Sequence, residues 1–194
     1  ATLSGFGNCA ANSGWNGTGS AANPYRLEFD SSDDTMNLSL PNISTAPGTY
    51  VSSEFWMWWD GTTDEMILGF SSYDLYAQGA NWGFNTAAGD IWGISSAGLS
   101  GRWVHVVAVF YNGDAKNNKI YIDGSLRAST QRQGTRGTRF LTTSAKISGW
   151  NNDTNYKWGG ALGKIAIYNK ELSPAEVSQN CNATKNRYQG AVCP

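Results

Sequence analysis

Charged residues are scarce in this sequence, and long hydrophobic runs are missing. Charged residues make up 15% of the 194 residues, and the formal net charge is −1. Without a broad basic surface, no nucleic-acid partner is expected. No run of about 18 apolar residues occurs, and therefore no membrane insertion is expected either. Aromatic residues, in contrast, reach 13%, which argues against a disordered chain, because such chains contain few aromatics.

Histidine and cysteine are also rare. The single His105 lies in an apolar stretch, and no Cys-x-x-Cys or paired-His spacing indicates zinc. The three cysteines Cys9, Cys181 and Cys193 lie near the termini. We expect a disulfide that ties the two ends of the chain together, although the pairing is open and one thiol is left over or bridges two chains. Such a disulfide predicts an oxidising compartment, and so a secreted or cell-surface protein (extracellular or periplasmic).

Turn-forming residues are abundant, with 23 glycines, and they separate short stretches in which apolar and polar residues alternate. We expect strands at 25–29, 36–38, 50–59, 65–71, 74–78, 82–85, 90–94, 103–111, 119–122, 125–129, 145–148 and 161–168. This pattern predicts an all-β fold, a two-sheet antiparallel β-sandwich (jelly roll). Residues 1–23 contain few apolar side chains and are interpreted as a lead-in or linker segment, followed by one domain over residues 24–194.

One short helix is expected near the C-terminus. Ser173 is a suitable N-cap, Pro174 suits the first helical position, and Glu176 completes a capping box. We expect this helix to have one or two turns.

Three stretches resemble landmarks of laminin G-like domains of the concanavalin A-like lectin/glucanase superfamily, whose sandwich is related to that of pentraxins. Residues 103–124, WVHVVAVFYNGDAKNNKIYIDG, resemble the family's hairpin "W-x-H-V-A … Y-x-D-G". Residues 26–34, RLEFDSSDD, resemble its early "L-x-F-D-G-x-D-D", with Ser31 where glycine is usual, and residues 163–177 resemble its closing strand and helix start. The resemblance covers residues 25–180 and implies the fold, but less about function, because one fold hosts many functions.

A catalytic role is not expected. Glucanases of this superfamily carry Glu-x-Asp-x-x-Glu on one strand, where alternation points the carboxylates into a cleft. That spacing is absent, and Asp60, Asp64 and Glu65 lie at a strand end and turn instead. The resemblance also makes His105 a structural core residue. A hydrolase remains the minor alternative, and it would need a pair of carboxylates in a cleft.

Calcium is the one cofactor that the sequence suggests. Calcium prefers six to eight oxygen ligands, which loops supply, and the loops 60–65 and 151–155 are rich in them. Pentraxins carry calcium ligands in two loops at comparable positions, which implies Asp64, Asn151 and Asp153 as ligands here. Asp33 and Asp34 are a weaker candidate. The alternative is that these residues only form turns.

The stretch SEFWMWW, residues 53–59, holds three tryptophans within four positions. Strand alternation predicts that Phe55 and Met57 face the core, and that Trp56 and Trp58 lie on the outer face of their sheet. An indole on that face could stack on a sugar ring. The alternative is that a loop such as residues 73–83 covers both rings.

Further candidate ligand-binding residues lie in loop-like contexts that we expect to gather at one edge of the sandwich. They are Trp82, Trp150, Asn151, Asn152, Tyr156 and Trp158. Aromatic rings beside hydrogen-bonding side chains suit sugar recognition, because stacking is combined with groups that fix orientation. The alternative is that these rings lock long loops onto the sandwich.

An arginine cluster, formed by Arg127, Arg132, Arg136 and Arg139, has two interpretations. It could bind an anion such as an acidic sugar or phosphate, or it could be a solvated loop or edge strand.

Together these features predict a non-catalytic carbohydrate-binding (lectin-like) adhesion module that recognises a glycan of a cell surface or matrix, with calcium as a candidate aid. The alternative is a protein-binding or structural module, at the tip or in a repeat of a surface fibre, pilus or large adhesin. A homo-oligomer formed through such a parent fibre is compatible with this alternative.

Overall fold

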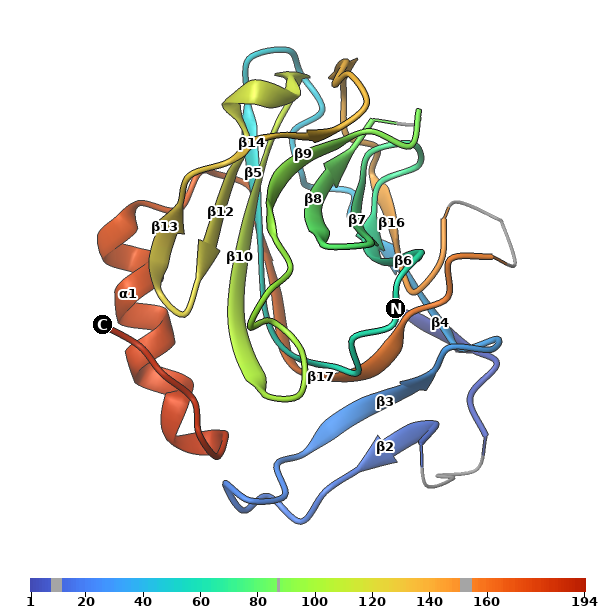
Figure 1. Cartoon of the computed structure of the whole chain (residues 1–194), viewed down its shortest axis with the longest axis vertical. Helices are drawn as coiled ribbons and strands as arrows, with labels where there is room; N and C mark the ends of the chain where they lie inside the picture. The colour runs from blue at the N-terminus through green and yellow to red at the C-terminus, as the bar shows by residue number, and fades with distance from the viewer. Residues whose placement is uncertain (8–11, 87, 151–154) are drawn as a thin grey trace.

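The computed structural model describes residues 1–7, 12–86, 88–150 and 155–194, and its strands form two large antiparallel sheets (Figure 1). The eight-stranded sheet runs in the order β1 (Thr2–Ser4), β4 (Thr35–Ser39), β16 (Ser144–Ile147), β6 (Glu65–Gly69), β7 (Asp74–Gln78), β8 (Asn81–Asn85), β9 (Ile91–Ser95) and β14 (Thr130–Gln133). The seven-stranded sheet runs in the order β13 (Ser125–Arg127), β12 (Lys119–Ile122), β10 (Trp103–Tyr111), β5 (Tyr50–Trp59), β17 (Gly159–Tyr168), β3 (Arg26–Asp30) and β2 (Gly14–Asn16).

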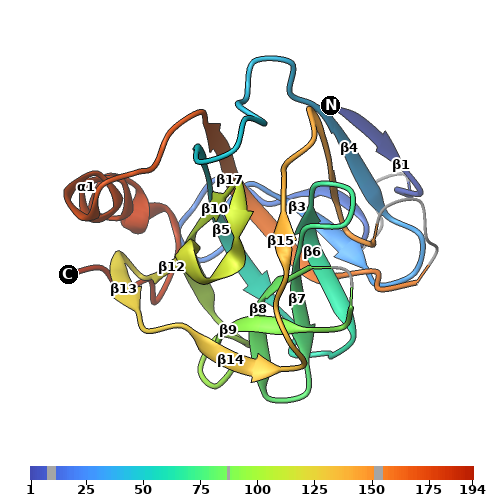
Figure 2. The ribbon, with the colours of Figure 1, turned by 90° about the horizontal axis from the view of Figure 1, so that it is seen from above.

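Five further elements complete the described part of the fold. A two-residue ladder joins β11 (Gly113–Asp114) to β15 (Thr138–Arg139), and short 3₁₀ turns η1 (Ala115–Asn117) and η2 (Lys185–Arg187) follow β11 and the helix, respectively. The helix α1 (Pro174–Thr184) lies beside β13, outside the sandwich (Figure 2). The predicted antiparallel β-sandwich with one short C-terminal helix is therefore confirmed.

The core lies between the two sheets and is built by alternation along the strands. On β5, Phe55, Met57 and Trp59 point into the main core, where they join Leu75 and Phe84 of the eight-stranded sheet. Burial of such side chains stabilises the fold by about 1.5–3 kcal/mol each. Because every second residue of β5 enters the core, its remaining side chains lie on the outer face of the seven-stranded sheet.

Residues 1–23, which we expected to be a lead-in segment, contribute one strand to each sheet. Strand β1 pairs with β4 at one edge of the eight-stranded sheet, and β2 pairs with β3 at one edge of the seven-stranded sheet. These strands could not be predicted from the residue pattern, because each has three residues and few apolar side chains. Backbone pairing to an existing sheet edge holds them there.

The helix α1 begins as predicted and runs further than predicted. Ser173 is the N-cap and Glu176 completes the capping box, with Pro174 at the first helical position. The helix has 11 residues instead of one or two turns. Val177 and Cys181 lie one turn apart and are both buried, so packing and not only capping determines its length.

The disulfide differs from the one that we expected. Cys181 of α1 is bonded to Cys193, so the bridge fastens the C-terminal residues to the helix and does not tie the two ends of the chain together. Cys9 lies outside the described residues.

Within the described part of the chain, no helix is long and apolar enough to cross a membrane.

Candidate functional site

Trp56, on the outer face of β5, is completely buried. Its ring stacks on Tyr188, with the centroids 4.6 Å apart, and its Nε1 donates to Thr184 Oγ1 at 2.9 Å. The C-terminal segment therefore covers this ring, and the loop at residues 73–83 does not. The expectation that Trp56 offers a face to a ligand is corrected, because Tyr188 already occupies that face.

Trp58 lies on the same outer face and is 37% exposed. The strand register sets its surroundings, because Trp103, Trp58, Ala161 and Glu28 follow one another across β10, β5, β17 and β3. Ala161 is the only small residue of this row, so the surface is hollow between the indole and the carboxylate. The neighbouring residue must be a glycine, Gly160, since a Cβ there would lie 2.2 Å from the Trp58 carbonyl oxygen.

This hollow is a pocket of about 440 Å³, within the usual size of about 300–1,000 Å³ for ligand sites. Trp58 and Trp103 supply aromatic surface, and most of the remaining lining is polar. The lining residues that carry polar side chains are Asn12, Asn23, Arg26, Glu28, Asp30, Ser31 and Asp60. An exposed indole surrounded by hydrogen-bonding groups is the combination that binds a sugar.

The polar rim of the pocket is held in place by its own contacts. Arg26 pairs with Glu28 at 2.7 Å and donates from Nη1 to Asn23 Oδ1 at 2.5 Å. Asn16 of β2 donates to the second oxygen of Glu28 at 3.0 Å, and Asp60 Oδ1 accepts from the backbone N–H of Thr62 at 2.8 Å. Because these side chains are already oriented, a ligand would not have to order them, which favours affinity.

A buried carboxyl group lies next to the pocket. Glu65 accepts from Trp59 Nε1 at 3.0 Å and from the Gly159 N–H at 3.1 Å. Burial and the negative charge of Asp60 raise the pKa of Glu65 to about 8. Glu65 therefore carries a proton at neutral pH and adds no negative charge behind the pocket.

The second group of predicted residues does not form the expected site. Trp82 and Trp158 belong to the main core, and Trp158 packs against Phe29 with the ring centroids 5.2 Å apart. This corrects the expectation for both rings, because neither offers a face to solvent. Trp150 and Tyr156 are partly buried against residues of the eight-stranded sheet, away from Trp58. Asn151 and Asn152 lie outside the described residues.

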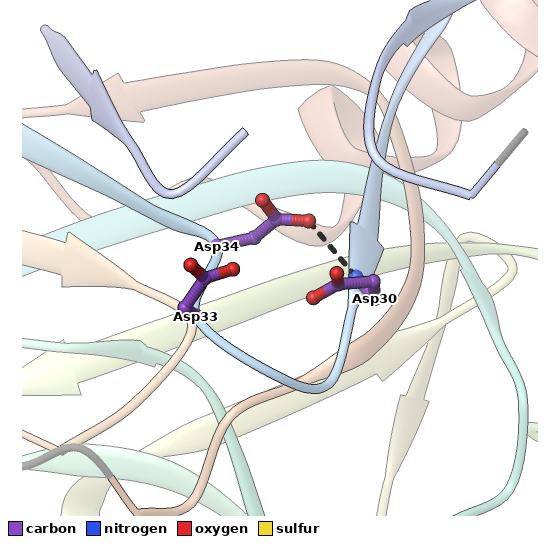
Figure 3. Close-up of side chains that lie close together, drawn as sticks. All are labelled: Asp30, Asp33 and Asp34. Atoms are coloured by element: carbon purple, nitrogen blue, oxygen red, sulfur yellow. Dashed lines mark hydrogen bonds between the residues drawn. The ribbon is translucent and has the colours of Figure 1, made fainter. Parts of the chain in front are cut away.

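Of the three predicted metal ligands, Asp64 lies among the described residues. Asp64 Oδ1 accepts from Tyr76 Oη and from Gln78 Nε2, both at 2.8 Å, so these bonds account for its position. Asn151 and Asp153 lie outside the described residues. The weaker candidate fits better: Asp33 and Asp34 lie together with Asp30 in the turn between β3 and β4 (Figure 3).

One carboxylate oxygen from each of Asp30, Asp33 and Asp34 lies within 4.8 Å of the others. Two oxygen atoms that each lie at the usual distance of about 2.3–2.6 Å from one calcium ion can be separated from each other by this distance. Asp34 is fully buried and accepts from Ser13 Oγ at 2.9 Å and from the Asp30 N–H at 3.0 Å. Burial, together with the two neighbouring carboxylates, raises the pKa of Asp34, and a cation would relieve that repulsion. The described residues thus include one acidic group that could hold a metal ion.

Sequence reasoning missed most of the pocket. Arg26, Glu28 and Asp30 alternate along β3 and could be assigned to one face, but no sequence signal placed that face beside Trp58. The adjacency depends on the pairing of β17 with both β5 and β3.

Comparison with known proteins identifies the family. The family model of the concanavalin A-like lectin/glucanases superfamily matches residues 30–178, and the chain belongs to this superfamily. Among curated proteins, none matches the chain. These findings confirm the predicted family.

Solved structures share the fold at low sequence identity. Domain 4 of AbnA, an extracellular arabinanase from Geobacillus stearothermophilus, in complex with arabinotriose, is 16% identical with a TM-score of 0.60, and the match covers 92% of this chain and 86% of that one. The botulinum neurotoxin serotype D ligand binding domain in complex with N-acetylneuraminic acid is 15% identical with a TM-score of 0.59, and the match covers 94% of this chain and 46% of that one. The match covers only 41% of another toxin chain, the receptor binding domain of mosaic serotype C/D.

Proposed function

We propose that this chain is a non-catalytic, lectin-like module that binds a glycan in the pocket around Trp58. The observation that carries the proposal is the 37% exposed indole that lines a pocket of about 440 Å³ with a polar rim. The similar folds of an arabinanase domain in complex with arabinotriose and of a toxin domain in complex with a sialic acid support a glycan as the ligand.

The chemistry of the pocket suggests how the glycan is held. The indole of Trp58 stacks on the C–H face of a sugar ring, while Arg26 and Asn23 donate hydrogen bonds to hydroxyl oxygens and Asp60 accepts them. Acidic side chains outnumber Arg26 in the lining, so an anionic sugar would be repelled. A neutral glycan is therefore the ligand class for this pocket.

Calcium would act on the rim of the pocket and not at the sugar itself. Asp30 belongs both to the pocket lining and to the acidic group with Asp33 and Asp34. A calcium ion held by these carboxylates would fix the turn after β3. The Cys181–Cys193 disulfide supports an oxidising compartment, which fits a secreted or cell-surface adhesion module that meets a surface or matrix glycan.

The test combines a glycan array with a matched pair of tryptophan variants. Trp58→Ala should weaken binding of any neutral glycan found on the array by about tenfold or more, the equivalent of about 1.4 kcal/mol. Trp15→Ala is the control, because Trp15 is 58% exposed and does not line the pocket. Unchanged binding by Trp58→Ala, or no glycan bound at all, would contradict the proposal.

The calcium step is tested by thermal unfolding with calcium and with a chelator. Calcium should raise the midpoint of unfolding and tighten glycan binding, because it binds only the folded turn. Asp33→Asn should reduce both effects and leave calcium-free binding unchanged, since Asp33 does not line the pocket. Equal midpoints in the two buffers would refute a calcium site.

One observation favours a hydrolase as a second function. Glu28, Asp30 and Asp60 line the same pocket, and glycosidases use paired carboxylates. Glu28, however, is engaged by Arg26 and Asn16, and Glu65 does not line the pocket. We expect every bound oligosaccharide to be recovered intact, and release of shorter products would reverse this assignment.

Another observation favours a protein-binding or structural module. Trp15 and Tyr25 are 58% and 68% exposed, and β2 is an edge strand with free backbone groups. If this edge contacts a second copy of the chain, sedimentation velocity will show a dimer that Trp15→Ala dissociates. A monomer at all concentrations tested would count against self-association through this edge.

A further inference from the structure

A second pocket lies at the opposite end of the seven-stranded sheet from β2, where the edge of one sheet faces the edge of the other. Strands β12 and β13 of the seven-stranded sheet supply Ile122 and Arg127, and β9 and β14 of the eight-stranded sheet supply Ile94 and Arg132. The chain crosses from β13 to β14 at this point (Figure 2). The volume of this edge cleft is about 440 Å³.

The charge of the edge cleft is opposite to that of the Trp58 pocket. Arg102, Arg127 and Arg132 line it, and among its described lining residues none is acidic. Among the described residues, Arg102 alone of the three forms an ion pair, to Asp123 at 2.6 Å. The cleft therefore holds two cations without a carboxylate counterpart in the described part of the chain.

The three guanidinium groups retain donors for a ligand. Arg102 donates from Nε to the Gly98 carbonyl oxygen, from Nη1 to the Trp103 carbonyl oxygen and from Nη2 to Asp123. Arg132 donates only from Nε, to Asn81 Oδ1 at 3.1 Å. The guanidinium group of Arg127 makes no hydrogen bond within the described residues. Since a guanidinium has five N–H donors, most of the donors in the cleft are unused, and the hydrogen bonds of Arg102 and Arg132 fix where those two groups lie.

The other two arginines of the sequence cluster are engaged elsewhere. Arg136 Nε donates to Asp114 Oδ1 at 2.9 Å, and its guanidinium lies 4.6 Å from the centre of the Trp92 ring. Arg139 Nη1 donates to the Thr138 carbonyl oxygen. The fold thus divides the cluster: two members stabilise loops, and the other two join Arg102 in the cleft.

We propose that the edge cleft is a second binding site, for an oxyanion-bearing glycan whose sulfate or carboxylate group is held by Arg102, Arg127 and Arg132. Guanidinium groups bind such oxyanions through paired, charge-assisted hydrogen bonds. The floor of Ile94, Leu99 and Ile122 gives apolar contact for a sugar ring, and Ser95 and Thr130 give hydroxyl groups. A small ion would use only the rim. This site does not rest on the function proposed for the Trp58 pocket.

The two pockets lie close together along the chain. Arg102 lines the edge cleft, and its neighbour Trp103 lines the Trp58 pocket. One pocket is rich in carboxylates and selects against anions, whereas the other selects for them. The two sites therefore discriminate between classes of glycan, which allows them to be tested separately.

The test is isothermal titration calorimetry with three oligosaccharides of equal length: one sulfated, one containing uronic acid and one neutral. The variant is Arg127→Gln/Arg132→Gln, and the control is Arg187→Gln, which makes the same type of charge change outside both pockets. We expect at least one anionic oligosaccharide to bind, and the double variant to weaken it about tenfold or more. The control and Trp58→Ala should bind it like the unmodified chain.

The sulfated and the uronate oligosaccharide distinguish between the two oxyanions. Binding of either one supports the site if raising the salt concentration weakens that binding. Arg127→Gln alone should also weaken binding, and because Arg127 is exposed without a partner in the described chain, it should not affect folding. The proposal is overturned by equal affinity for the neutral oligosaccharide or for inorganic sulfate, by unchanged binding in the double variant, or by no saturable binding at low salt.

Discussion

Trp56 and Trp58 lie on the same face of the same strand, yet one is completely buried and the other is 37% exposed. Strand alternation does not explain the difference, because both rings point away from the core. Trp56 is covered by Tyr188 and Thr184 from the C-terminal segment, whereas small Ala161 lies beside Trp58. The covering segment, and not strand alternation, therefore decides which outer-face tryptophan is accessible to a ligand.

Two fully buried glutamates extend the comparison to charge. Burial alone would raise the pKa of Glu54, which lies beneath the C-terminal region, but hydrogen bonds from His105, Lys164 and Tyr168 outweigh burial and lower it to about 2. Glu65 forms no ion pair with a cation in the described part of the chain, and burial with repulsion from Asp60 raises its pKa to about 8. The contacts of Glu54 on β5 stabilise its charge, whereas the surroundings of Glu65 on β6 suppress one.

The largest expected effect comes from Trp56→Ala. Removing this indole should lower the free energy of unfolding by about 3–5 kcal/mol, because the surrounding cluster cannot fill the cavity. Trp58→Ala should cost about 1 kcal/mol or less, because that ring is partly exposed. Urea unfolding of the two variants checks this, and equal losses would erase the distinction between the two rings.

The next effect comes from opening the disulfide. Cys193→Ser should lower the free energy of unfolding by about 3 kcal/mol, the value for a closed loop of this size, and the fluorescence of the native state should shift as the cover over Trp56 loosens. The unmodified chain under reducing conditions should behave in the same way. If neither change moves the urea midpoint, the bridge does not secure the covering segment.

The pH dependence of Glu54 gives a smaller effect with a defined sign. Its pKa is about 2 in the folded chain and 4.5 ordinarily, so its charge contributes stability above pH 4.5 that is lost as the pH falls toward 2. Glu54→Gln should remove that part of the acid sensitivity. Stability measured from pH 5 to pH 2 checks this, and identical pH slopes for both proteins would contradict it.

A pH effect of the opposite sign is expected for Glu65→Gln. Because the pKa of Glu65 is raised from 4.5 to about 8, the folded chain retains a proton that the unfolded chain loses, and stability falls as pH rises between these values. Glu65→Gln should therefore reduce the fall in stability with rising pH. It should not abolish it, because burial also raises the pKa of Asp74 to about 8, and Asp74 contributes in the same way. A slope that the substitution leaves unchanged would show that Glu65 titrates normally.

Much of the fold could be predicted from the sequence, because strand alternation and family landmarks are local. The predicted bounds of β5, β7, β10 and β12 match those observed. The site could be predicted only in part. Trp58 was a candidate, but Ala161 and Glu28 were not, because their adjacency to it depends on long-range pairing. Trp82 and Trp158 have glycine neighbours that suggested loops, yet both rings are core.

The pairing of β3 with β17 places Glu28 opposite Ala161, and this has a consequence for biosynthesis. While the chain is made, every residue that lines the Trp58 pocket except Gly160 and Ala161 emerges from the ribosome well before the strand that joins them. Contacts between such distant segments form slowly. Until β17 enters the sheet, β3 has no neighbour on its inner side and Trp58 has no pocket. The pocket is thus complete only after β17, the last strand of the described chain, has been made.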